Sequence, residues 1–142
     1  MNVHHFKRGD DLLKAVKDVD IIVDVLSSNP SSKGLLDKSF FDSLRNGTIF
    51  ISAVVARNIE DIEAMLTALD EGRLAYVAHD VADARPGDSD DQLYKKLRQH
   101  QNVFVTPHIA GFSDVTTQIG NDMMIANVEA WLKGKPINVF GK

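Results

Sequence analysis

The sequence predicts an α/β fold in which a parallel sheet lies between layers of helices, a three-layer sandwich. Two observations lead to this prediction: four short runs rich in β-branched residues, and a helix-like stretch between each run and the next. Strands that are joined by helices of this length pair in parallel, because the helix carries the chain back to the starting edge of the sheet. The predicted strands are residues 21–26, 48–55, 74–81 and 103–105.

The predicted helices follow from apolar side chains at helical spacing. Residues 9–19 carry an apolar face and two aspartates in the first turn, where the helix dipole favours carboxylates. Residues 37–44 place Phe40 and Phe41 on such a face, and residues 58–69 repeat the pattern. Two more helices are predicted at residues 90–99 and 113–133, and the second of these ends before Gly134 and Pro136.

Composition excludes several classes of protein. The 142 residues are 44% hydrophobic and 25% charged, which is typical of one globular domain. A net charge of −4 without a basic cluster argues against a nucleic-acid partner. The absence of cysteine excludes disulfides and thiolate sites, and the apolar runs are too short to cross a membrane. We therefore expect a soluble, cytoplasmic protein with no metal site and no membrane partner.

Polar residues follow each predicted strand, and the carboxyl ends of parallel strands meet at one edge of a sheet, where ligands bind. The turn Thr106-Pro107-His108 follows the fourth strand and presents one imidazole there. Histidine is the side chain best suited to exchange a proton near neutral pH, although an exposed turn histidine without a function fits the same pattern. Gly111 would let a ligand approach the backbone closely.

Five segments together resemble a known family, the D-isomer-specific 2-hydroxyacid dehydrogenases. Residues 29–36 (N-P-S-S-K-G-L-L) are similar to the family's T-P-x-T-x-G-L-I loop, and residues 44–52 to its M-K-P-G-A-x-L-I-N strand. Residues 68–75 resemble A-L-x-S-G-x-L-A, and residues 78–81 (A-H-D-V) resemble A-L-D-V. Residues 102–111 (N-V-F-V-T-P-H-I-A-G) match N-V-I-x-T-P-H-I-A-G almost residue for residue.

The resemblance implies an NAD- or NADP-dependent oxidoreductase that converts a 2-hydroxy acid to a 2-oxo acid. Position by position, the family's general acid/base falls on His108, and the aspartate that holds the nicotinamide falls on Asp80. Backbone contacts with the cofactor fall on Leu26, Ser27, Ser28 and Gly111.

Two catalytic positions of the family are occupied differently here. Arg85 stands where the family has the glutamate that pairs with the histidine, and Asp83 is the nearest carboxylate that a shifted loop could supply. The substrate arginine falls on Val55 or Ala56, with Arg57 the nearest guanidinium. Arg57 and Asp83 are therefore the candidate replacements, and a surface arginine at a helix start is the alternative for Arg57.

The resemblance also implies a partial Rossmann fold. None of the 9 glycines forms the G-x-G-x-x-G turn that holds the pyrophosphate of a dinucleotide. Residues 1–142 are thus expected to be the C-terminal portion of a Rossmann-type NAD-binding domain, its second mononucleotide-binding half, without the first βαβ unit. We expect a truncated dehydrogenase that acts on a small 2-hydroxy or 2-oxo acid and forms a homodimer. A catalytically inactive, dimerising α/β remnant and a relative with a rearranged site are the alternatives.

Overall fold

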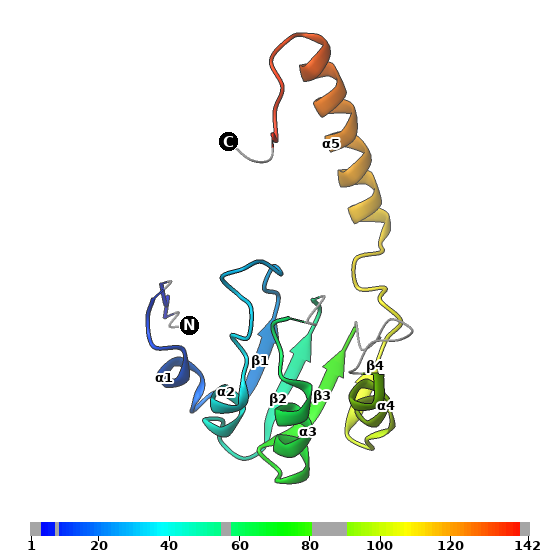
Figure 1. Ribbon diagram of the computed structural model, residues 1–142. Helices are drawn as coiled ribbons and strands as arrows, with labels where there is room; N and C mark the ends of the chain where they lie inside the picture. Colours follow the sequence, from blue (N-terminus) through cyan, green and yellow to red (C-terminus); the bar gives the residue numbers. More distant parts are fainter. Residues whose placement is uncertain (1–3, 8, 55–57, 81–90, 140–142) are drawn as a thin grey trace. The chain divides into compact units, whose positions relative to one another are not determined.

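The computed structural model describes residues 4–7, 9–54, 58–80 and 91–139 (Figure 1). The chain divides into two compact units, Met1–His108 and Ile109–Lys142, and each is described by itself. Arg57 and Asp83 lie outside the described residues, as do Val55, Ala56 and Arg85.

The first unit contains a four-stranded parallel sheet of strand order β1-β2-β3-β4. Its strands are β1 (Ile21–Asp24), β2 (Thr48–Ser52), β3 (Leu74–His79) and β4 (Val103–Val105). The α/β class and the parallel pairing that the sequence predicts are confirmed. Three strands end two or three residues earlier than predicted. At β1 the reason is local, because Asp24 Oδ1 accepts the Leu26 N–H at 2.8 Å and turns the chain.

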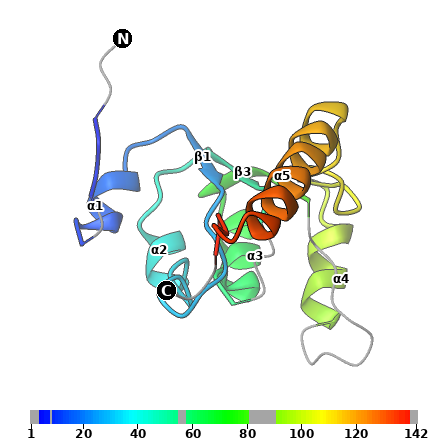
Figure 2. The ribbon, with the colours of Figure 1, turned by 90° about the horizontal axis from the view of Figure 1, so that it is seen from above.

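The helices among the described residues of this unit are α1 (Leu12–Val16), α2 (Lys38–Asp42), α3 (Ile62–Asp70) and α4 (Asp91–Gln99). Aspartates cap the first three, since Asp11, Asp37 and Asp61 each accept a backbone N–H from three residues further along. Figure 2 shows α2, α3 and α4 on the same face of the sheet. Strands in sequential order with right-handed crossovers require this arrangement.

The other face of the sheet is open in the described part of residues 1–108. Its side chains form two rows across the strands, Ile21–Ile49–Tyr76 and Val23–Ile51–Ala78–Phe104. Tyr76 is 58% exposed and Phe104 69% exposed. The described helices of this unit therefore supply one of the two covering layers of the predicted sandwich. Helices cover the second face of such a sheet only where the strand order reverses, because the crossover helices then lie on the opposite side. A complete doubly wound sheet contains such a reversal.

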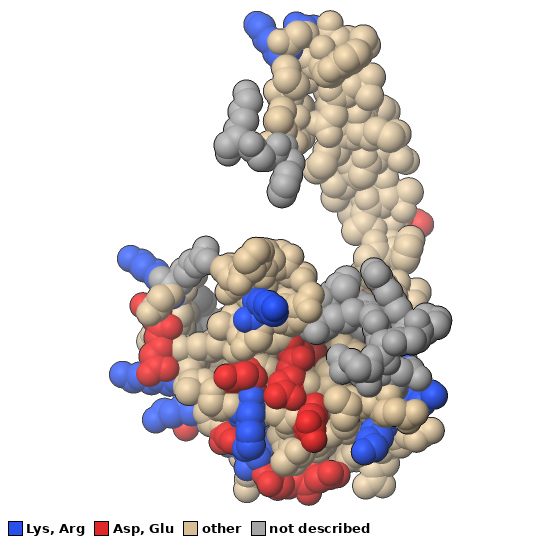
Figure 3. All heavy atoms as spheres, viewed as in Figure 1, with Lys and Arg blue, Asp and Glu red and all other residues tan. Residues whose placement is uncertain are grey.

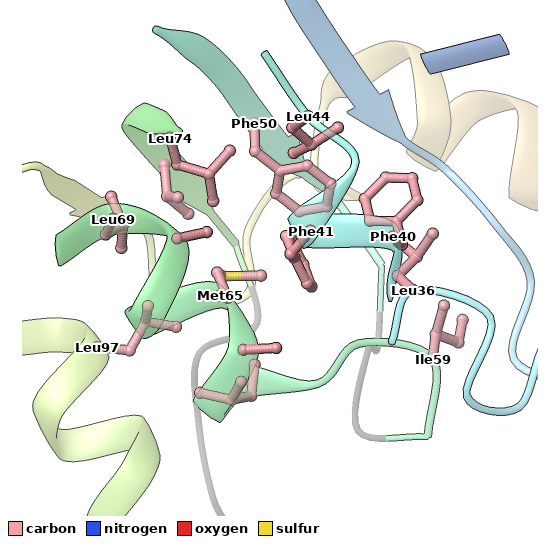
Figure 4. Close-up of a cluster of buried hydrophobic side chains, with 14 of the residues drawn as sticks. Leu36, Phe40, Phe41, Leu44, Phe50, Ile59, Met65, Leu69, Leu74 and Leu97 are labelled. Atoms are coloured by element: carbon pink, nitrogen blue, oxygen red, sulfur yellow. The ribbon is translucent and has the colours of Figure 1, made fainter. Parts of the chain in front are cut away.

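The hydrophobic core lies between the sheet and the helices α2 and α3 (Figure 4). Phe40, Phe41 and Phe50 pack edge to face, with ring centroids 5.2 to 6.5 Å apart. Met65, Leu69, Leu74 and Leu97 are also buried. On the helix-covered surface, acidic and basic side chains are interspersed, and Asp42 pairs with both Lys38 and Arg73 (Figure 3).

The second unit is built on one long helix, α5 (Asp114–Leu132). A capping box begins it: Ser113 Oγ accepts the Thr116 N–H at 3.1 Å, and Thr116 Oγ1 accepts the Ser113 N–H at 2.9 Å. The helix has no buried residue, and Trp131 is 70% exposed. No helix among the described residues is both long and apolar enough to cross a membrane.

Candidate functional site

The carboxyl ends of the strands carry a row of polar side chains. The sheet register aligns Asp24 of β1 with Ser52 of β2, and Ser52 with His79 of β3. All three side chains are buried on the helix-covered side of the sheet. Asp80, the residue after β3, follows this row, and its backbone N–H donates to the Ser52 carbonyl oxygen at 2.9 Å. The structure therefore places a row of buried polar groups at the carboxyl edge of the sheet.

Asp80 and the turn after β4 form one hydrogen-bonded constellation. The Thr106 hydroxyl donates to Asp80 Oδ1 at 2.5 Å, and the Asp80 side chain is buried. The His108 backbone N–H donates to the Asp80 carbonyl oxygen at 2.7 Å. These bonds join the end of β3 to the end of β4, so that the predicted nicotinamide aspartate and the predicted acid/base are neighbours in the chain's fold.

His108 adopts an unusual backbone conformation. Its φ of +56° lies in the left-handed region, which few residues other than glycine occupy. The hydrogen bond to Asp80 holds this conformation, and His108 is exposed. The arrangement can present an imidazole to a ligand at the carboxyl edge of the sheet, with the buried Asp80 bound to its backbone through a main-chain carbonyl.

A second group of titratable side chains lies beneath this edge. His79 Nε2 donates to Glu60 Oε2 at 2.9 Å, and both side chains are fully buried. Burial raises the pKa of Asp24 from 3.8 to about 6; the Leu26 N–H opposes this shift, and the negative charge of Glu60 adds to it. His79 takes the place of the leucine in the A-L-D-V motif, and its burial under the helices agrees with strand alternation.

The predicted cofactor residues lie in different parts of the structure. Leu26 and Ser27 line a hollow of about 440 Å³ between the N-terminal segment, α1 and the loop after β1. The other lining residues are Phe6, Lys7, Gly9, Asp10, Asp11, Leu12, Ala15, Asn29, Ser31, Ser32 and Leu35. Ser28 is exposed and does not line it. Gly111 belongs to the second unit, where its carbonyl oxygen accepts the Thr116 hydroxyl at 2.8 Å.

Two residues that the sequence interpretation did not single out take part in these contacts, Thr106 and Glu60. Thr106 belongs to the T-P-H turn, so a polar side chain beside the candidate histidine was the available signal. Glu60 gave no local signal, because it reaches His79 only through the fold. Within the described residues, no group of three or more histidine, aspartate or glutamate side chains is arranged to hold a metal ion.

The parallel sheet with its polar carboxyl edge defines a Rossmann-type α/β domain. Residues 2–110 match the family model described as "D-isomer specific 2-hydroxyacid dehydrogenase, NAD binding domain". Because this match covers most of the chain, the chain belongs to the D-isomer-specific 2-hydroxyacid dehydrogenase family.

Named relatives agree with this assignment. D-lactate dehydrogenase of Staphylococcus aureus is 32% identical over 118 residues, which is 77% of this chain and 36% of the relative. D-3-phosphoglycerate dehydrogenase of Haemophilus influenzae is 32% identical over 110 residues, which is 78% of this chain and 26% of the relative. The solved structure of D-2-hydroxyisocaproate dehydrogenase has a similar fold, with a TM-score of 0.80, 23% identity and coverage of 96% of this chain and 47% of that chain. This chain thus spans about a third of the length of the first relative.

Proposed function

We propose that residues 1–142 are the C-terminal portion of an NAD(P)-binding domain in an enzyme that oxidises a 2-hydroxy acid to a 2-oxo acid. The observation that carries this proposal is the link between the His108 N–H and the Asp80 carbonyl oxygen at 2.7 Å. Through this main-chain bond, an exposed histidine lies next to a buried aspartate at the sheet edge where ligands of parallel α/β folds bind.

In this proposal, His108 takes the proton of the substrate hydroxyl group during oxidation and returns it during reduction. Asp80 holds the carboxamide of the nicotinamide, with Thr106 fixing the orientation of its carboxyl group. When bound, NAD or NADP supplies the hydride acceptor for the reaction. The exposure of His108 supports its role, because a proton-transfer group must reach a bound substrate.

The 440 Å³ hollow supports a cofactor role for Leu26 and Ser27. Its volume lies in the range of small-molecule pockets, and its walls combine apolar side chains with a few polar groups, which suits a flat ring with a polar rim. Ser28 and Gly111 remain proposed contacts of the protein backbone with the cofactor. The residues present therefore fit part of a dinucleotide, while the G-x-G-x-x-G turn is not among residues 1–142.

Arg57 and Asp83 are the residues proposed to act on the substrate side of the site. A guanidinium binds a carboxylate through two parallel hydrogen bonds, so Arg57 is proposed to hold the substrate carboxylate. Asp83 is proposed to pair with the His108 imidazole. Both assignments come from the sequence, since both residues lie outside the described ranges.

We also propose that the protein forms a homodimer and is located in the cytoplasm. The open face of the sheet supports self-association. The same face favours the second candidate function, a non-catalytic module whose role is to associate. Its apolar side chains Ile21, Val23, Tyr76 and Phe104 are each more than half exposed. The two candidate functions can be distinguished, because the dehydrogenase needs the His108 side chain for proton transfer and the non-catalytic module does not.

His108→Asn in the complete gene product that contains residues 1–142 tests the proposal. Asparagine tolerates the left-handed backbone but cannot exchange a proton near neutral pH. We expect kcat with a 2-hydroxy acid and NAD(P) to fall by about 10²–10⁴-fold, and the dissociation constant of the cofactor to stay nearly unchanged. The control is His100→Asn, a histidine that lies beside Asp70 and away from this edge. Unchanged turnover in the His108 variant would overturn the mechanism.

A further inference from the structure

Four buried polar side chains lie together beneath the candidate site and have no role in the proposed function. Asp24, Ser52 and His79 occupy one register row at the carboxyl ends of three neighbouring strands. Their exposed fractions are 4%, 2% and 1%. Burying a polar side chain costs free energy of folding unless the side chain is hydrogen-bonded. The buried row therefore needs a physical explanation.

Glu60 covers the row from the segment that precedes α3. It is buried, and its Oε2 accepts the His79 Nε2–H at 2.9 Å. The segment around Glu60 is tied to the loop after β1: the Leu36 N–H donates to the Ile59 carbonyl oxygen, and the Asp61 N–H donates to the Leu36 carbonyl oxygen, both at 2.9 Å. The position of Glu60 is therefore coupled to two loops at the carboxyl edge.

The cluster has more acceptors than donors. Two of its buried carboxyl oxygens, Asp24 Oδ2 and Glu60 Oε1, have no hydrogen-bond partner among the described residues. The Ser52 hydroxyl, which also has no partner there, can supply one donor and therefore cannot satisfy both. Two ionised carboxylates can only accept hydrogen bonds, and they would also repel each other. One added proton on Asp24 supplies a donor and removes a negative charge at the same time.

The surroundings of Asp24 favour this proton. The titratable groups of the described residues that face it are Glu60 and His79. The other elements packed near it are apolar, since Leu12, Val16 and Phe40 of α1 and α2 line a hollow of about 290 Å³ together with Asp24. Burial, followed by the nearby Glu60 charge, raises the pKa of Asp24 to about 6, although the Leu26 N–H and His79 act in the opposite direction.

We propose that Asp24, Ser52, Glu60 and His79 form a buried proton-binding site that tightens the packing of the segment before α3 on the sheet when Asp24 is protonated and loosens it when Asp24 ionises. This inference does not rest on the proposed enzymatic function. Because the segment also pairs with the loop after β1, proton binding would stabilise two loops at the carboxyl edge together.

The direction of the pH effect follows from linkage. The pKa of Asp24 is about 6 in the folded chain and near 3.8 when the chain is unfolded. The folded state therefore holds this proton more tightly, and its contribution to stability is complete below pH 3.8. That contribution is lost as the pH rises from about 4 to above 6.

Urea unfolding of the 142-residue chain at pH 4 to 8 tests the proposal, with Asp24→Asn as the variant. Asparagine is nearly isosteric with the protonated acid and cannot ionise. The unfolding equilibrium constant of the wild type, divided by that of Asp24→Asn, should rise by about 10- to 100-fold between pH 4 and pH 8. The control is Asp18→Asn, whose side chain is 83% exposed, and its ratio to the wild type should stay constant within about twofold. A constant ratio for Asp24→Asn would overturn the proposal.

A second measurement needs no variant. In a carbon-13 NMR titration of the wild-type chain, the Asp24 carboxyl should titrate with a midpoint near 6. Hydrogen-exchange protection of the Leu36 and Asp61 amides, which report on the segment before α3, should fall over the same range once the intrinsic pH dependence of exchange is removed. A midpoint below 4.5, or protection independent of Asp24 ionisation, would contradict the proposed coupling.

Discussion

The contact between Thr106 and Asp80 shows how one side chain orders the candidate site. A hydroxyl group donates to a buried carboxyl oxygen at 2.5 Å and thereby joins the turn after β4 to the end of β3. The same turn places the His108 N–H on the Asp80 carbonyl oxygen. A single residue of the T-P-H turn thus supports both the position of the aspartate and that of the histidine.

Thr106→Val is expected to destabilise the chain. Valine keeps the shape of threonine but leaves a buried carboxyl oxygen without this donor, which should lower the free energy of unfolding by about 1–3 kcal/mol. Urea unfolding followed by circular dichroism measures the change. Thr106→Ser is the matched control, because it keeps the hydroxyl group and should lose less than half as much. Equal losses in the two variants would mean that the methyl group, rather than the hydrogen bond, stabilises this turn.

The segment before α3 and the helix itself act as one element. Asp61 caps α3 by accepting the Ala64 N–H at 3.0 Å, and its own N–H is bound to the Leu36 carbonyl oxygen. The start of the helix is therefore anchored to the loop after β1. Glu60 precedes this cap, so the cap also sets where the Glu60 side chain meets His79.

Asp61→Ala should cost about 1 kcal/mol of stability, because it leaves an N–H group in the first turn of α3 without its acceptor. The chemical shifts of His79 should change as well, since the capping residue positions Glu60. Unfolding by urea and a two-dimensional NMR spectrum measure both effects. Asp18→Ala is the control, as Asp18 is exposed and caps no helix described here. An Asp61 variant as stable as the Asp18 variant would rule out a stabilising cap.

At the scale of the whole molecule, the open face of the sheet exposes apolar side chains of the described part of the first unit. One of its apolar rows crosses three strands and the other crosses all four, and exposed apolar surface of this kind is typical of an association site. Self-association would remove this surface from water, which is the main favourable contribution to protein association.

Phe104→Asp should reduce self-association. The ring is 69% exposed on the open face, and a charge in its place would have to be desolvated in a dimer. Sedimentation velocity at about 5 to 50 μM, a range typical of such experiments, should show a dimer for the wild type and a monomer for this variant. Gln92→Asp on the exposed surface of α4 is the control with the same change in charge, and it should remain dimeric. A monomeric wild-type chain would remove the support for association.

Much of the fold could be predicted because its signals are local. β-Branched runs and helical spacing mark strands and helices along the chain, and the aspartates before α1, α2 and α3 mark their starts. The T-P-H turn could be found in the same way, since the residues that place His108 at the end of β4 are adjacent in the sequence. The resemblance to a family of dehydrogenases rests on such contiguous segments too.

The proximity of Asp24, Ser52, Glu60 and His79 could not be predicted from the sequence in this way. The sequence shows that Asp24 interrupts an apolar run and that His79 lies in a predicted strand. It does not show that the two residues belong to one row of the sheet. Strand order and register bring them together, and these depend on the packing of side chains far apart in the sequence. The open face has the same origin, because sequential strands place every crossover helix on one side. Local propensity specifies the elements, whereas burial and pairing between distant segments specify which of their side chains meet.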